Sequence, residues 1–111
     1  MKTVLSACIL IGLTSTAIAC DLTGIKGSIS DDGRTITSRQ SIPLKDQART
    51  YGGYERAATY MEQNRLGVLQ NSGYSQAVKD QVDRDMLKNV EDLKCWASIC
   101  KQNGTDPGCQ F

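Results

Sequence analysis

The sequence predicts a small all-α fold: an antiparallel helical hairpin, preceded by an irregular or β-hairpin N-terminal arm and stapled by disulfides. Two observations carry this prediction. Aromatic residues are few, with one Trp, one Phe and four Tyr, so the core must be mostly aliphatic, which favours packed helices over a sheet sandwich. The clearest apolar period, over residues 75 to 97, repeats every three or four positions, as on one face of a helix.

The first residues of the chain are typical of a secretion signal. Lys2 is the charged start, residues 4 to 13 form an apolar run, and Ala17 and Ala19 are the small residues that signal peptidase requires. An uncleaved membrane anchor is the alternative, and the Thr/Ser-rich end of the segment argues against it. We expect the following organisation: a signal peptide (1–19), an N-terminal arm (20–42), a helical hairpin (43–102) and a cysteine-closed tail (103–111).

Composition and charge exclude several classes of function. The chain has 13 basic and 12 acidic residues, and the loss of Lys2 with the signal leaves a balanced charge, which gives no general attraction to nucleic acid or to an anionic membrane. Histidine is absent, which removes the commonest general base and the commonest metal ligand. We therefore predict a non-enzymatic protein with no catalytic residue, metal, cofactor or nucleic-acid partner.

The arm contains a turn signal. Asp31-Asp32-Gly33-Arg34 lies between two short stretches in which Ile alternates with Ser or Thr, and this pattern predicts a small hairpin or else an extended arm. The acidic pair would suit calcium, but the regular Asp spacing and the closing Glu of a calcium loop are missing. A turn is the expected role of the pair.

The first half of the helical hairpin begins at Pro43, because Pro suits the first turn of a helix. Residues 44 to 51 continue it until Gly52-Gly53, which marks a break, and a longer helix then runs to Gln70. Asn71-Ser72-Gly73 stops this helix, with Gly73 as the expected left-handed cap.

The second helix has Ser75 as its N-cap. Its opposite face is charged and is expected to be solvated. Two helices with a short connection pack antiparallel, so the apolar stripe is expected to form core, and in so small a core part of it is also a candidate partner surface. The stripe consists of Val78, Val82, Met86, Val90, Leu93 and Ala97.

Four cysteines remain after the signal is removed, and in a small exported domain they predict two disulfides. Cys95 and Cys100 lie five apart on the predicted helix, more than ~7 Å between Cα atoms, beyond disulfide reach. Turn sequences in residues 101 to 108 can return Cys109 to the helix end, which favours Cys100–Cys109 with Cys20–Cys95. The pairing Cys95–Cys109 with Cys20–Cys100 is the alternative. A metal or redox site is disfavoured, because the close Cys-x2-Cys pairs are missing.

Cys20 has a second interpretation. Ala17-Ile18-Ala19-Cys20 also satisfies the peptidase that processes lipoproteins, and a lipid on Cys20 would hold the protein on a bacterial membrane. Lipidation would leave an odd number of cysteines, which favours a soluble protein with Cys20 in a disulfide. Contact with a membrane is expected only through such a lipid.

The cysteine-rich end resembles a known group. Residues 93 to 100, Leu-Lys-Cys-Trp-Ala-Ser-Ile-Cys, followed by Gly104, Pro107 and Cys109, are similar to the cysteine segment of the TrbM/KikA group of exported conjugal-transfer proteins. The resemblance implies a periplasmic accessory of a type IV secretion or plasmid-transfer apparatus, with a structural role for the three cysteines. We therefore expect an envelope or secretion-apparatus protein as partner; a free secreted effector or toxin-like protein is the alternative.

Overall fold

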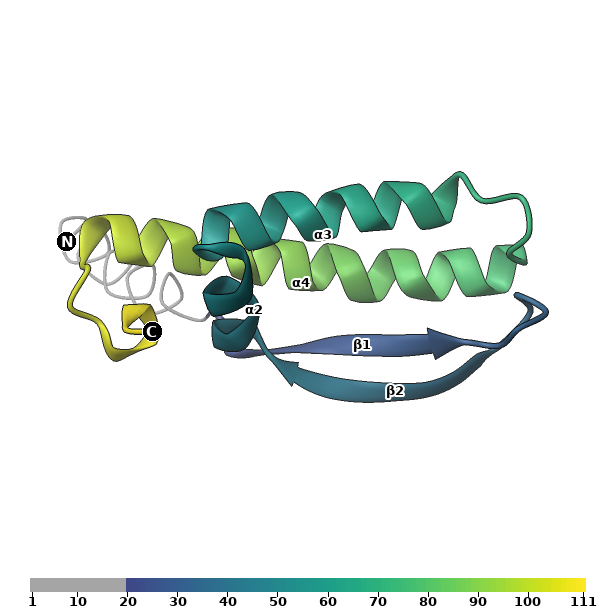
Figure 1. The fold of residues 1–111 in the computed structure, drawn as a ribbon, viewed down its shortest axis with the longest axis horizontal. Coiled ribbons are helices and arrows are strands. Elements are labelled where there is room, and N and C mark those ends of the chain that lie inside the picture. Colours follow the sequence, from purple (N-terminus) through teal and green to yellow (C-terminus); the bar gives the residue numbers. More distant parts are fainter. Residues whose placement is uncertain (1–19) are drawn as a thin grey trace, which may run out of the picture.

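The computed structural model describes residues 20–111, and the expected signal peptide lies outside them. The two long helices lie side by side, and α4 lies between α3 and the β-hairpin in the view of Figure 1. The short helix α2 is steeply inclined to both and connects the hairpin to α3 (Figure 1). The elements in chain order are β1 (Thr23–Ile29), β2 (Ile36–Pro43), α2 (Leu44–Tyr51), α3 (Tyr54–Leu69), α4 (Gln76–Gln102) and the 3-10 turn η1 (Pro107–Cys109).

The fold is mixed α/β, so the all-α prediction is wrong. Strands β1 and β2 form a two-stranded antiparallel sheet in which Gly24 pairs with Ile42 and Gly27 with Arg39. The β-hairpin that the sequence allowed for the arm is therefore present. Its sheet makes the fold class α/β and not all-α. An isolated two-stranded hairpin is marginally stable in water. This one is held by α4, whose Asn89 bonds to Ile25 of β1 across 64 positions of sequence, and no local pattern in the sequence shows such a contact.

The hairpin turn follows its local sequence. The N–H of Gly33 donates to the carbonyl oxygen of Ser30 over 2.9 Å, and Gly33 has a φ of 73°, in the left-handed region that glycine favours. The Asp32 carboxylate accepts from the Ser30 hydroxyl and from the N–H of Arg34. These two bonds, the first above all, lower the pKa of Asp32. Asp32 thus shapes the turn.

Helix α2 follows Pro43 directly and ends at Gly52, whose φ of 87° makes it a left-handed cap. The predicted break at Gly52-Gly53 is confirmed. Helix α3 ends at Leu69, followed by Gln70 in a right-handed conformation. The left-handed cap predicted at Gly73 is wrong, because the positive-φ glycines do not include it.

Helix α4 begins as its sequence predicts. The Ser75 hydroxyl accepts from the N–H of Val78 over 3.3 Å, which is the expected N-cap bond. Four residues of the predicted stripe, Val78, Val82, Val90 and Leu93, are buried. The core lies where α2, α3 and the C-terminal half of α4 meet, and it contains Leu44, Ala48, Tyr54, Ala57, Ala58, Met61, Val90, Leu93 and Trp96.

Candidate functional site

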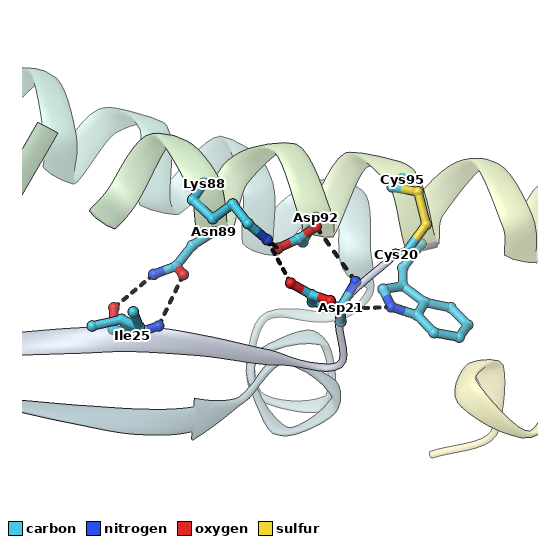
Figure 2. A network of polar contacts seen from close by, with 8 residues as sticks. Cys20, Asp21, Ile25, Lys88, Asn89, Asp92 and Cys95 are labelled. Carbon is cyan, nitrogen blue, oxygen red and sulfur yellow. Dashed lines mark hydrogen bonds and ion pairs between the residues drawn. A yellow bond between two sulfur atoms is a disulfide. The ribbon is translucent and has the colours of Figure 1, made fainter. Parts of the chain in front are cut away.

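One face of α4 holds the N-terminal strand, and Asn89 is its centre (Figure 2). The Asn89 side chain is buried, its Nδ2 donates to the carbonyl oxygen of Ile25 over 2.8 Å, and its Oδ1 accepts from the N–H of Ile25 over 2.9 Å. One amide thus satisfies both backbone groups of a residue on the outer edge of β1. The Asn89 side chain thus forms the two backbone hydrogen bonds that a third strand would form at that edge.

Gly24 makes this close approach feasible. A Cβ at this position would lie 2.5 Å from Oδ1 of Asn89 and 2.8 Å from a methyl carbon of Leu44. Both neighbours are fully buried, so neither has room to move aside. Strand β1 therefore needs glycine where it meets α4 and α2.

A second set of contacts fixes Asp21, two residues before the start of β1 (Figure 2). The indole N–H of Trp96 donates to the carbonyl oxygen of Asp21 over 2.9 Å. The ammonium group of Lys88 bridges the carboxylates of Asp21 and the largely buried Asp92. Hydrogen bonds to these two carboxylates raise the pKa of Lys88. This polar cluster anchors the start of the arm on α4.

Two disulfides complete the attachment. Cys20 is bonded to Cys95, with 5.9 Å between the Cα atoms, and Cys100 to Cys109, with 5.6 Å. The first ties the start of the arm to α4 (Figure 2), and the second closes the C-terminal tail onto the end of the same helix. These are the pairs that the turn sequences of the tail favour, and the alternative pairing is not the one in the structure.

The far end of the hairpin is also attached to α4. The N–H of Ser75 donates to the carbonyl oxygen of Gly33 over 2.8 Å, and the Ser75 hydroxyl donates to that of Arg34 over 3.3 Å. Between the two ends, the guanidinium group of Arg39 forms two hydrogen bonds of 3.0 and 2.8 Å with the Asp85 carboxylate. This pairing raises the pKa of Arg39. The hairpin is therefore held at its base, middle and tip.

The hairpin, α2, α3 and α4 enclose a cavity of about 340 Å³, which we call the groove. Half of the residues that line it have aliphatic or thioether side chains. The hairpin contributes Ile25, Ile29, Ile36 and Ile42. The two long helices contribute Met61, Val68, Val82 and Met86.

The rim of the groove is polar and partly aromatic. Tyr51 and Tyr60 line it and stack on each other with 4.3 Å between ring centroids, and the neighbouring Tyr60 side chain raises the pKa of Tyr51. Asp85 also lines the groove, but its charge is balanced by Arg39. Lys26 lines the groove as well, and within residues 20–111 no carboxylate forms an ion pair with it.

The structure joins the four candidate disulfide cysteines in two pairs, Cys20 with Cys95 and Cys100 with Cys109. Across the described part of the chain, no three His, Cys, Asp or Glu side chains form a group suited to a metal ion. In the same residues, no helix combines the length and the apolar character that crossing a membrane requires.

Sequence reasoning missed the groove. Ile25, Ile29, Ile36 and Ile42 look like isolated apolar positions in a polar arm. A signal was nevertheless present, because two of them precede the turn and two follow it, and the hairpin pairs Ile29 with Ile36. On the helical side, Val82 and Met86 belong to the predicted apolar stripe of the second helix.

Comparison of the chain with family models, with curated protein sequences and with solved structures gives no significant match.

Proposed function

We propose that this chain is an exported, non-enzymatic protein that acts by binding, as an accessory component of an envelope complex such as a conjugative type IV secretion apparatus. The groove carries the proposal. It presents eight aliphatic side chains on a framework held at three places, and preorganised apolar sites of this kind are typical of ligand and partner recognition. The similarity of the cysteine segment to conjugal-transfer proteins supports the choice of apparatus.

The disulfides support export. Two disulfides in a chain of this size are compatible with an exported protein, because such bonds form and persist in oxidising compartments. They also favour the soluble form over the lipoprotein. The sulfur of Cys20 is bonded to that of Cys95, and a sulfur in a disulfide has no valence left for a thioether to a lipid.

The mature protein provides a direct test of this form. Protein purified from the envelope of its own host should have the intact mass of residues 20–111, lowered by two hydrogens for each disulfide. A digest without reduction should contain the linked peptides Cys20–Cys95 and Cys100–Cys109. A mass increased by a diacylglycerol group would contradict the soluble form.

The role in transfer is tested by deleting the gene in its host. Conjugation frequency should fall, and a plasmid copy of the wild-type gene should restore it. A copy encoding Asn64→Trp, which places an indole at the groove, should restore less than one encoding Gln63→Trp, whose position lies outside the groove on the same helix. Unchanged frequency after deletion would contradict the proposal, as would purified protein that alters target cells without any donor machinery.

A further inference from the structure

We propose that the groove binds the alkyl chain of a single-chain amphiphile with an anionic head group, such as a long-chain fatty acid. The inference goes beyond the proposed function and does not depend on it, because it concerns only what fits between the hairpin and the helices. Three properties of the groove carry it: its volume, its fixed walls and its charge.

The volume suits one flexible chain better than an element of secondary structure. A helix about 10 Å across fills about 120 Å³ per residue, so 340 Å³ would hold about three residues of a partner helix. A methylene is about as large as a water molecule, which occupies about 30 Å³ in the liquid. The groove is therefore of the size that suits one alkyl chain of moderate length, such as the tail of dodecanoate.

Several contacts hold the walls of the groove in place. The hairpin is held against α4 at its base by Asn89, in its middle by the Arg39–Asp85 pair and at its tip by Ser75. Gly27 lines the groove with no side chain, and a Cβ there would approach Ile36 to 3.3 Å. The aliphatic surface is thus kept apart, and an alkyl chain that fills the space would remove it from water.

The charge selects the head group. The Asp85 carboxylate is paired with Arg39, whereas Lys26 brings a positive charge to the groove with no ion-pair partner in the described residues. An anionic head group beside Lys26 would complete an ion pair at the solvent edge, where such pairs contribute modestly. A cationic head group would gain nothing there.

The test is calorimetric titration of the purified, oxidised mature protein with octanoate, decanoate, dodecanoate and tetradecanoate below their micelle concentrations. The dissociation constant should fall about fourfold for each added methylene, because each buried methylene contributes a fixed increment of transfer free energy. The increment should disappear beyond about twelve carbons, when the groove is full. Dodecyltrimethylammonium should bind more weakly than dodecanoate.

Two matched pairs of variants assign the binding to the groove. Asn64→Trp should weaken dodecanoate binding at least tenfold, whereas Gln63→Trp should not change it, because only residue 64 lines the groove. Lys26→Gln should weaken it about two- to fivefold, whereas Lys79→Gln, a lysine on α4 outside the groove, should not. The circular dichroism spectrum and unfolding midpoint identify any variant that fails to fold.

Several outcomes would overturn the inference: affinity that does not depend on chain length, equal binding by both Trp variants, or equal affinity for the cationic and anionic probes. Vesicles of anionic phospholipid distinguish the source of the alkyl chain, and protein that binds vesicles but not dodecanoate would also contradict it. The proposed function is tested separately, since loss of conjugation in a deletion strain can be observed whether or not dodecanoate binds.

Discussion

At the scale of single residues, Asn89 shows how much one side chain can decide. It lies between Met86 and Val90 of the apolar stripe, and its polarity looks like an exception in the sequence. In the structure it is buried and bonded to both backbone groups of Ile25. The position of Asn89 on a core-facing helix was predictable, but its partner was not, because the two residues are 64 positions apart.

Asn89→Ala should therefore destabilise the fold. The substitution leaves the N–H and the carbonyl oxygen of Ile25 without partners, and we expect a loss of about 2–3 kcal/mol in the free energy of unfolding. Urea denaturation followed by circular dichroism measures it. Asn64→Ala, at an exposed position of α3, is the control and should stay within about 0.5 kcal/mol of the wild type. Equal effects of the two substitutions would contradict the role given to Asn89.

Tyr54 gives the stability a dependence on alkaline pH. It is buried, its hydroxyl donates to the carbonyl oxygen of Gly108 over 2.5 Å, and burial together with the Asp106 carboxylate raises its pKa. A pKa that is higher in the folded than in the unfolded state stabilises the fold below the unfolded value of about 10, and this contribution is lost as the pH rises through the folded value.

Unfolding midpoints between pH 8 and pH 11 test this. Tyr54→Phe should lower the free energy of unfolding by about 1 kcal/mol at pH 8, through loss of the hydrogen bond to Gly108. The difference between wild type and variant should shrink above pH 10, because the tyrosine must then ionise. A difference that stays constant up to pH 11 would show that Tyr54 does not titrate in this way.

At the scale of elements, the helices and the turn were predictable because their signals are local. The breaks at Gly52-Gly53, the N-cap at Ser75 and the Asp-Gly turn all act within a few residues. Strand β2, with the sequence ITSRQSIP, has no buried residue. It is a strand because β1 pairs with it and because Arg39 reaches Asp85. The composition favoured packed helices because it indicates how a core is built. A two-stranded sheet that buries few residues leaves little trace in the composition.

Two glycine substitutions compare the docking of a strand with the interior of a helix. Gly24→Ala should destabilise the fold by about 2 kcal/mol or more, because the added methyl group would collide with Asn89 and Leu44. Gly67→Ala in α3 should stabilise it by about 0.5–1 kcal/mol, since no atom lies within 4 Å of the new methyl group and alanine favours helix. Thermal and urea unfolding measure both. Destabilisation of equal size in the two variants would contradict a tight contact at Gly24.

At the scale of the whole molecule, the two disulfides close loops of very different length. Cys20 and Cys95 are 75 positions apart, whereas Cys100 and Cys109 are nine apart. By loop-closure entropy, replacing the first pair by serines should cost about 4.5 kcal/mol and replacing the second about 3 kcal/mol. Denaturation of the two double variants checks this order. The reverse order would show that native contacts, rather than loop length, set the contribution of each bond.

The groove also belongs to this scale. It is formed by the hairpin, α2, α3 and α4 together, and each element contributes a few residues that look ordinary in its own sequence. Periodicity assigns Val82 and Met86 to the inward face of their helix, and this is correct. It does not show that a cavity remains beside them, because the cavity depends on where the hairpin is attached.

The attachment of β1 to α4 also orders events in time. A chain appears from its N-terminus, so residues 20 to 43 exist before α4 does. Alone, a two-stranded hairpin is marginally stable, and Asn89, Asp92, Cys95 and Trp96, which hold β1, lie in the last quarter of the chain. The first part of the protein to emerge is therefore the last to become permanently ordered. Any factor that binds the chain during synthesis or translocation therefore meets a hairpin that lacks its contacts with α4 until that helix is complete.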